Sequence, residues 1–220
     1  PLLRVRQVTI IGNVHTPRAE LLAAAGLSSG ATLMIETGSG AERRAVQALP
    51  WVGTADFARH WPWTLVITVH ERAPAALVPG SPGATDVVDQ TGRVLEVLAR
   101  GERGPALAVL QGVRGALPGQ RVSPAEPSTD LAALLAAAAS TPPALARDGL
   151  SLGAGPGGQL VAYYGPGKVV VLLGSPSQVA YKLAVLGELA QRVQLLGYSQ
   201  ADLRVPERPA LSPVPSAGNS

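Results

Sequence analysis

The sequence predicts an α+β protein in two parts: a small N-terminal domain with the element order β-α-α-β-β, and a β-rich domain with a long C-terminal helix and a final edge strand. Three observations predict this. Apolar residues recur at helical spacing and then in alternation within the first 72 residues. Strand-like runs dominate later, and a Pro- and Gly-rich stretch separates the two regions. We expect a first domain over 1–73, a linker over 74–85, a second domain over 86–211 and a disordered tail over 212–220.

The elements of the first domain are predicted from turn and capping residues. A β-branched run from Val5 to Ile11 ends at a Gly-Asn turn, which indicates the first strand. Thr16 is expected to cap a short helix, with Gly26 as its stop. A second helix over Glu42–Leu49 and two strands, Val52–Arg59 and Thr64–Glu71, complete the order.

The second domain is predicted to begin with a hairpin whose turn is Asp89–Gly92. The best helical pattern in the chain runs from Ser177, a plausible cap, to Leu196. A last strand is expected over Tyr198–Val205. The other expected elements are strands at Leu107–Leu110, Leu150–Leu152, Leu160–Tyr164 and Val169–Leu173, a loop at Gly115–Ser128 and a helix at Leu131–Ala139.

Composition excludes several classes of protein. With 46% hydrophobic residues the chain can build a core, and without cysteine it has no disulfide, thiolate nucleophile or Cys-ligated zinc. The net charge of +3 and the scattered arginines argue against nucleic acid. Arginine far outnumbers lysine beside abundant Ala and Gly, which suggests a GC-rich bacterium. The chain starts without Met, lacks an apolar run of about 20 residues and looks like an excised segment, so an anchor could lie upstream.

No convergent catalytic set is found, so we expect neither an enzyme nor a cofactor, metal or small-molecule substrate. His15, His60 and His70 lack metal-ligand spacing. A GxGxxG match at residues 153–158 contains a proline and precedes a strand, which argues against a dinucleotide site. Asp86 and Asp89 are the closest carboxylates of the β-rich region, and they flank a turn that favours Asp.

Two features remain. Trp51, Trp61 and Trp63 adjoin strand ends and are interpreted as packing residues rather than a ligand platform. The segment 202–213, DLRVPERPALSP, is either a last strand that frays into a tail or an open sheet edge on which another chain can add a strand.

These residues resemble the extracytoplasmic part of the bacterial cell-division family FtsQ, also called DivIB. The likeness begins with VTIIGN at 8–13, the turn at 30–33, LPWV at 49–52 and VHERAP at 69–74, which are similar to the family's POTRA domain and its ER-x-P ending. It continues with the Val-Asp-x-x-Gly hairpin at 88–92, LAVLQG at 107–112, Leu173–Gly174, Lys182–Leu183 and DLR at 202–204.

The resemblance implies a single-pass type II membrane protein of the division septum, with a short cytoplasmic N-terminus and a transmembrane helix that are absent here. It implies a divisome scaffold that binds FtsB (DivIC) and FtsL, with FtsB adding a strand along the last strand of the β domain. Pro206 and Pro209 remove N–H donors from this edge, which leaves open continuous pairing or a shorter, shifted contact. The implied partner-binding residues are Arg204, which would pair with an acidic residue, and Val205, Pro206, Glu207, Arg208, Ala210 and Leu211.

Three hypotheses follow. The first is a non-catalytic scaffold that binds other division proteins and helps regulate septal peptidoglycan synthesis. The second, based on the first domain alone, is a POTRA-type polypeptide-transport or chaperone module. The third is a hydrolase of envelope polymers that uses Asp86 and Asp89.

Overall fold

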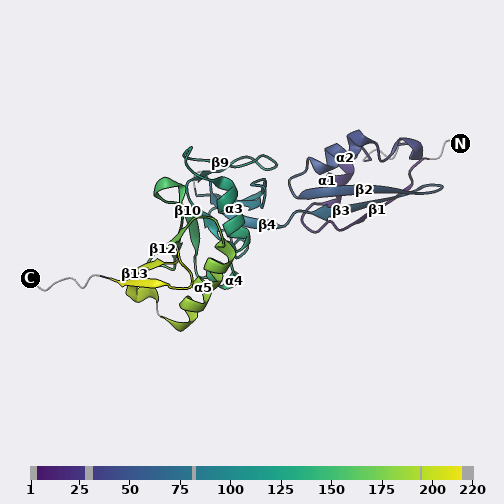
Figure 1. Cartoon of the computed structure of the whole chain (residues 1–220). Helices are drawn as coiled ribbons and strands as arrows, with labels where there is room; N and C mark the ends of the chain where they lie inside the picture. Colours follow the sequence, from purple (N-terminus) through teal and green to yellow (C-terminus); the bar gives the residue numbers. More distant parts are fainter. Residues whose placement is uncertain (1–3, 28–31, 81–82, 194, 215–220) are drawn as a thin grey trace, which may run out of the picture. The chain divides into compact units, whose positions relative to one another are not determined.

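A computed structural model of the chain describes residues 4–27, 32–80, 83–193 and 195–214. The chain divides into two compact units, Pro1–Ala73 and Pro74–Ser220 (Figure 1). Each unit has its own cluster of buried apolar side chains. The α+β class and the β-α-α-β-β order of the first unit are therefore confirmed.

The first unit is a three-stranded sheet with two short helices packed against it. The central strand β3 pairs in parallel with β1 and antiparallel with β2, in the order β1-β3-β2. Its elements are β1 (Gln7–Ile11), α1 (Arg18–Ala24), the 3-10 turn η1 (Met34–Glu36), α2 (Gly40–Gln47), β2 (Val52–His60) and β3 (Thr64–Glu71).

The alternation in β3 explains how the sheet buries one face. Leu65, Ile67 and Val69 are fully or almost fully buried, whereas the residues between them are partly exposed. Leu21 from α1 and Val46 from α2 are buried in the same core, so the helices cover that face.

The helix ends differ from the prediction at α1. Thr16 does not cap α1, because Pro17 holds the cap position and no side chain caps the helix. Gly26, with φ of +67°, lies just beyond the last turn, as expected for a helix stop. In α2, Ser39 accepts from the N–H of Glu42, whose carboxylate accepts in return from the N–H of Ser39.

The second unit is built on a nine-stranded sheet with the order β14-β13-β12-β11-β10-β7-β4-β5-β6. A separate two-stranded pair joins β8, which ends just before the predicted Gly115–Ser128 loop, to β9 within that loop. The strands are β4 (Pro74–Pro79), β5 (Thr85–Asp89), β6 (Val94–Leu98), β7 (Val109–Leu110), β8 (Val113–Arg114), β9 (Ser123–Pro124), β10 (Ser151–Ala154), β11 (Leu160–Tyr164), β12 (Val169–Gly174), β13 (Tyr198–Asp202) and β14 (Ala210–Pro213).

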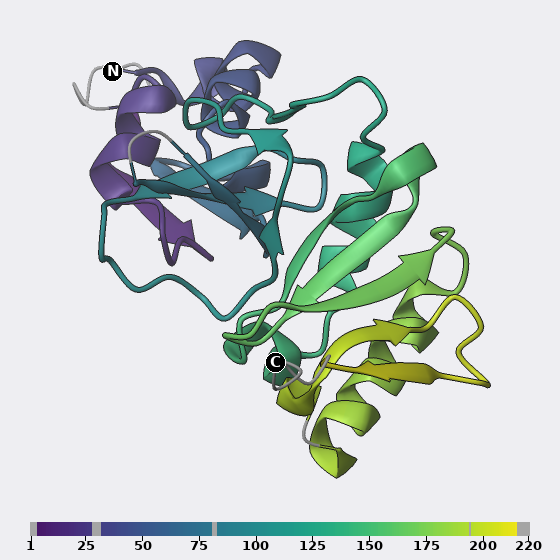
Figure 2. The ribbon, with the colours of Figure 1, turned by 90° about the vertical axis from the view of Figure 1, so that its left-hand side faces the viewer.

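Helices cover this sheet on one side (Figure 2). Helix α3 (Leu131–Ala139) packs on β4, β7 and β10, and the long helix α5 (Val179–Arg192) contacts α3. Both contribute buried leucines to the core. The remaining helical segments are α4 (Pro143–Arg147) and the 3-10 turns η2 (Pro156–Gly158) and η3 (Leu195–Gly197).

Four predictions require correction or fall outside the structure. The linker over 74–85 is wrong, because Pro74–Pro79 form β4, whose first and last residues tolerate proline at the strand ends. The helix expected over Ser177–Leu196 is shorter, and Gln178 rather than Ser177 precedes it. The tail expected from residue 212 begins with strand residues, and 215–220 lie outside the described residues. Residues 30 and 31, half of the turn predicted at 30–33, are also outside them.

Candidate functional site

The C-terminal edge of the nine-stranded sheet is a hairpin, not the single last strand that the sequence predicts. Strand β13 ends at Asp202, the chain turns through residues 203–209, and β14 returns antiparallel to β13. Pro206 and Pro209 lie in this turn, so neither interrupts the edge strand. The edge position belongs to β14. The two prolines that were expected to remove N–H donors from the pairing strand therefore lie outside that strand.

The outer side of β14 offers few hydrogen-bonding groups. The N–H of Val214 donates to the carbonyl of Gly197 at 3.4 Å, toward the β13 side. Because N–H direction alternates along a strand, Ala210 and Ser212 also face β13, whereas Leu211 and Pro213 face outward. Proline has no N–H, and the Pro213 carbonyl accepts from the Ser199 hydroxyl at 3.2 Å, so the outer edge presents the N–H and carbonyl of Leu211.

Arg204 is held at the start of the turn by Asp202. Its Nε lies 3.0 and 3.1 Å from the two carboxylate oxygens of Asp202, and its Nη2 lies 2.6 Å from Oδ2. The same hydrogen bonds lower the pKa of the Asp202 carboxyl and raise the pKa of Arg204. A Cβ on Gly174 would come within 2.9 Å of the Arg204 side chain, so the stem of Arg204 lies directly over this glycine.

A buried lysine fixes the neighbouring end of β12. Lys182 of α5 is only 2% exposed, and its ammonium group donates to the carbonyls of Leu173 at 2.7 Å and Ser175 at 2.9 Å. Burial lowers the pKa of Lys182. Leu203, the residue before Arg204, is fully buried. The N–H of Leu203 donates to the carbonyl of Leu172 on β12. The turn that carries Arg204 is therefore fastened to β12 at its base.

The predicted binding residues are brought together, but not all face solvent. A shallow pocket of about 350 Å³ is lined by Asp202, Arg204, Val205, Arg208 and Ala210. Two guanidinium groups and one carboxylate line it, which suits an acidic side chain better than a basic one. Of the predicted set, Arg204, Val205, Glu207, Arg208 and Ala210 are exposed, Leu211 packs partly on the core, and Pro206 is buried.

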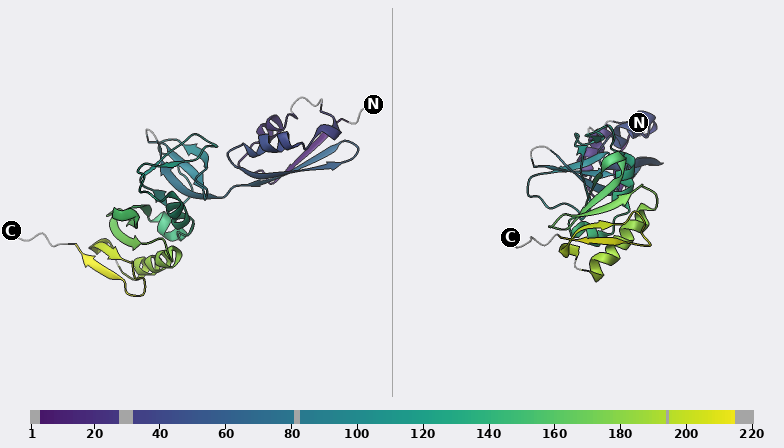
Figure 3. Two further views of the ribbon diagram at one scale, coloured as in Figure 1. Left: turned by 45° about the horizontal axis from the view of Figure 1, so that its top comes forward. Right: turned by 60° about the vertical axis from the view of Figure 1, so that its left-hand side comes forward.

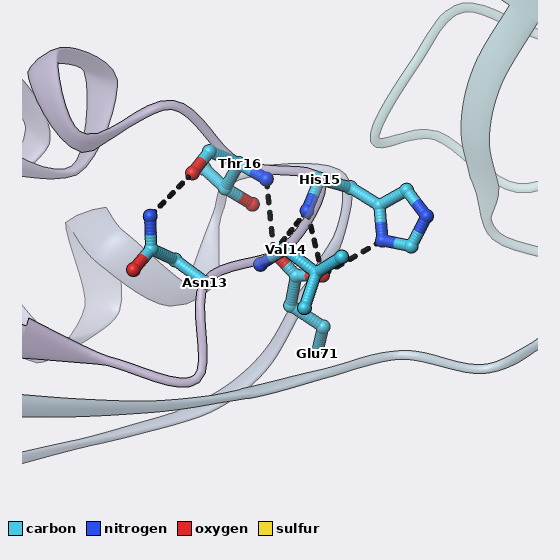
Figure 4. A network of polar contacts seen from close by, with 5 residues as sticks. All are labelled: Asn13, Val14, His15, Thr16 and Glu71. Atoms are coloured by element: carbon cyan, nitrogen blue, oxygen red, sulfur yellow. Dashed lines mark hydrogen bonds and ion pairs between the residues drawn. The ribbon is translucent and has the colours of Figure 1, made fainter.

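The VHERAP motif also has a structural role, which is centred on Glu71 (Figure 4). The Glu71 carboxylate accepts from the N–H groups of Val14, His15 and Thr16 at 2.8–3.0 Å, and from the His15 ring at 2.8 Å. Burial acts to raise the pKa of Glu71, but the hydrogen bonds from His15 and Thr16 outweigh it and hold the pKa at about 2. The loop before α1 is thus fastened to the end of β3.

Asp86 and Asp89 do not form a catalytic pair. Asp89 accepts from the N–H of Thr91 and Arg93 within the β5–β6 turn. Asp86 accepts from the N–H of Ala116, and burial raises its pKa against the effect of that bond. Three positions apart on one strand, the two side chains point to opposite faces of the sheet. The geometry removes the basis for the hydrolase hypothesis.

The histidines and tryptophans fall into different environments. His60 and His70 are exposed, and His15 stacks on buried Trp51 with ring centroids 3.9 Å apart. In the described ranges no three metal-ligating side chains cluster. The packing interpretation holds for Trp51 but is wrong for Trp61 and Trp63, which are 54% and 45% exposed.

The resemblance proposes Arg204 as a binding residue, but the sequence analysis missed the residues that position it. The sequence places Asp202 in the DLR motif and in the candidate edge segment without a role of its own. The i, i+2 spacing of Asp202 and Arg204 is the signal for their pairing, since alternate residues share one side of an extended chain. Lys182, one of only two lysines in the chain, sits among apolar positions of α5, and that contrast could have marked it as buried. Strand β14 left no comparable signal, because its composition is that of a tail.

Comparison with known proteins gives two matches. Residues 3–72 match the family model of the FtsQ-type POTRA domain. Over 108 residues, 49% of this chain, the sequence is 34% identical to the cell division protein FtsQ of Streptomyces griseus. The aligned part covers 51% of that relative, so the chain spans about half the length of the curated protein it matches. Across the described residues, no helix combines the length and hydropathy that a membrane crossing requires.

Proposed function

Because the chain belongs to the FtsQ/DivIB family of bacterial cell-division proteins, we propose that it is a non-catalytic scaffold that binds FtsB (DivIC) and FtsL at the division septum. Through those partners it helps regulate septal peptidoglycan synthesis. An N-terminal transmembrane helix ahead of the sequence holds it to the cell membrane as a type II protein, with this region outside the cytoplasm.

The observation that carries the proposal is the outer side of β14 beside the Arg204 pocket, where no other strand pairs within the residues that the structure describes. An added strand gains hydrogen bonds from backbone groups, and a nearby side-chain contact sets its register. Here the outward N–H and carbonyl of Leu211 supply the backbone part. Arg204 and Arg208 line the pocket next to it and receive a carboxylate of the FtsB segment.

The edge favours a short contact over a long one. Pro209 precedes β14 and Pro213 ends it, so Leu211 has the one outward N–H between them. Such a protected edge resists indiscriminate strand pairing, because an arriving chain finds few donors. A partner must therefore add side-chain contacts, and the pair of guanidinium groups selects an acidic one.

Asp202 sets the strength of that selection. The Asp202 carboxylate already accepts hydrogen bonds along the Nε–Nη2 edge of the Arg204 guanidinium. A partner carboxylate therefore shares Arg204 with Asp202. Arg204 has further N–H groups beyond those used by Asp202, since a guanidinium carries five donors. This arrangement orients Arg204 before binding and lowers the entropic cost of the contact.

A binding experiment tests the proposal. The chain is titrated with the extracytoplasmic segment of FtsB from the same organism, and affinity is measured by calorimetry. Arg204→Glu and truncation after Leu203 are each expected to lower affinity by tenfold or more, whereas Arg147→Glu, at an exposed site on α4, leaves it unchanged. Undiminished binding by both site variants would refute this edge as the FtsB site.

A second arm of the experiment separates the scaffold from the polypeptide-transport or chaperone module. The same titration is repeated with unrelated extended peptides of equal length and charge. The scaffold binds the division segments selectively. Equal affinity for unrelated peptides would favour the transport module instead.

A further inference from the structure

The exposed tryptophans of the first unit form a surface that the proposed function leaves unused. Trp61, Pro62 and Trp63 make the tip of the β2–β3 hairpin, and all three are exposed. Trp61 is 54% and Trp63 45% exposed, in a chain that has only three tryptophans. Two neighbouring exposed tryptophans are costly in water, because each displays a large apolar ring.

Basic side chains surround this tip. Arg6 places its guanidinium 5.3 Å from the centre of the Trp63 ring, and its N–H donates to the Trp63 carbonyl at 3.0 Å. Arg59, at the end of β2, donates to the carbonyls of Ile35 and Thr37. Segments 4–10 and 57–69 contain no acidic residue, and one carboxylate, Glu36, lies in the η1 turn that Arg59 contacts.

The tip lies at the end of the sheet where the chain enters the unit. Strand β1 is parallel to β3, with Gln7 opposite Thr64, so the segment leading into β1 meets the hairpin tip (Figures 1 and 3). Strand β3 ends at Glu71, at the opposite end of the sheet.

We propose that the Trp61–Trp63 tip, with Arg6 and Arg59, is a membrane-contact surface that inserts its indole rings into the interface of an anionic lipid bilayer. Tryptophan is enriched at membrane–water interfaces because its ring is apolar and its N–H is polar. Arginines beside it are attracted to the negative surface potential of anionic lipids. The basic charge and the lack of carboxylates at the tip suit an anionic lipid surface, and the pair of exposed indole rings suits the membrane–water interface.

The surface rests in part on the proposed N-terminal anchor, which brings the tip within reach of the bilayer. Contact at the tip then sets the direction of the first unit. Strand β3 runs for eight residues away from the tip, so its Glu71 end is held up to about 25 Å from the lipid surface. An anchor alone would leave the unit free to tilt.

Vesicle binding tests the proposal with the 220-residue chain. The chain is mixed with phosphatidylcholine vesicles with and without phosphatidylglycerol, and binding is followed by co-sedimentation and tryptophan emission. We expect binding to the anionic vesicles, a blue shift of the emission, quenching by lipids with brominated acyl chains, and weakening by salt. The measurement is repeated with the chain tethered to nickel-chelating lipid by an N-terminal or a C-terminal histidine tag.

Variants identify the surface. Trp61→Ser with Trp63→Ser is expected to lower vesicle affinity roughly tenfold or more, and Arg6→Gln about fivefold. Val14→Ser, an 82%-exposed apolar residue near the Glu71 end, and Arg103→Gln, which removes an exposed charge from the second unit, serve as matched controls. Trp51 remains in the double serine variant, and its unchanged emission shows that the unit is folded. Trp61→Tyr with Trp63→Tyr should restore most of the binding.

Two results would overturn the membrane surface: no quenching of the N-terminally tethered chain by brominated lipid, or equal vesicle binding by the double serine variant. Either leaves the tip as a protein contact. The FtsB titration is performed without vesicles, so the scaffold proposal and the membrane proposal fail independently. Vesicle binding by the untethered chain also tests the membrane contact of the tip without any assumption about the anchor.

Discussion

At the scale of single residues, Glu71 joins the loop before α1 to the end of β3 through four different donor groups. Three consecutive backbone N–H groups converge on one carboxylate, which is the arrangement by which proteins hold anions next to helix N-termini. No other segment pairs with these N–H groups among the hydrogen bonds described. The loop conformation therefore depends on the charge of a single side chain.

We predict that Glu71→Gln lowers the free energy of unfolding of the first unit by about 2 kcal/mol at neutral pH. The pKa of Glu71 is about 2 in the folded chain, against an ordinary value of 4.5. A depressed carboxyl pKa gives stability that is complete above the unfolded pKa and is lost as pH falls toward the folded one. The gap between wild type and Glu71→Gln should therefore narrow from about pH 5 to about pH 2.

Urea unfolding followed by tryptophan fluorescence measures this gap, because all three tryptophans lie in the first unit. Glu20→Gln, at an exposed position in the first turn of α1, is the matched control and should change stability by less than about 1 kcal/mol. A pH-independent gap would show that the Glu71 charge is not what holds the loop.

Lys182 is the corresponding residue of the second unit. Its ammonium group is buried and forms no ion pair within the described part of the chain, and it donates to two carbonyls at the end of β12. We predict that Lys182→Met destabilises the second unit by about 2 kcal/mol. The two carbonyls lose their donor, and this loss outweighs the gain from no longer burying a charge. The other lysine, exposed Lys168, supplies the control Lys168→Met. Unfolding is followed by far-ultraviolet circular dichroism, and equal stability of the two variants would contradict the prediction.

At the scale of elements, the prolines around β14 limit what can pair with it. The alternation along β14 places the nitrogen of Pro213, which carries no hydrogen, on the outer side. Alanine at this position therefore adds an N–H donor to the outer side without removing one from the hydrogen bonds to β13. If the proposed FtsB segment adds to this edge, Pro213→Ala should tighten its binding about fivefold, the value of one additional hydrogen bond. Calorimetric titration with the FtsB segment measures this.

The control for that variant is Pro118→Ala, which replaces an exposed proline in the loop before β9. It should leave the affinity for the FtsB segment unchanged. A gain limited to Pro213 supports strand addition, since side-chain docking alone is indifferent to a backbone N–H. Affinity unchanged by Pro213→Ala would place the partner elsewhere than along the outer side of β14.

Elements with a strong period were predictable from sequence. The alternation of Thr64–Glu71 gives β3 with the same ends, and the apolar run Leu131–Ala139 gives α3 with the same ends. Strands β4 and β14 were not predicted, since proline occurs at both ends of β4 and at the end of β14. Proline excludes a position from hydrogen-bond donation but not from a sheet edge or a strand end, and a sequence does not show which of these applies.

The candidate site was predictable only in part, for a related reason. Arg204 and its neighbours were placed at the edge by resemblance, and the structure brings most of them to one pocket. Asp202 pairs with Arg204 two positions along the chain, so that contact is local and its signal lies in the sequence. Lys182 acts on carbonyls at the end of β12, so its role depends on how α5 packs against that strand. The solvent exposure of Trp61 and Trp63 likewise depends on what the hairpin tip meets, which alternation cannot predict.

At the scale of the whole molecule, the buried apolar residues form two separate clusters, one in each unit. The first cluster contains residues between Val5 and Val69, and the second starts at Ala76. A domain of about 70 residues is large enough to fold without disulfides or metal. The chain lacks cysteine, so the first unit depends on its core and on contacts such as those of Glu71.

We predict from these two cores that residues 1–73 fold without the rest of the chain. The fragment ends just before β4, so it keeps every strand of the three-stranded sheet together with Glu71 and its loop. Its tryptophan-monitored urea midpoint should equal that of the full chain, because no strand of the first sheet pairs with one of the second in the described structure. Residues 74–220 should in turn keep the FtsB affinity of the full chain. A fragment that is unfolded, or whose midpoint is well below that of the full chain, would show that the first unit draws stability from the second, and the two would then be one cooperative domain.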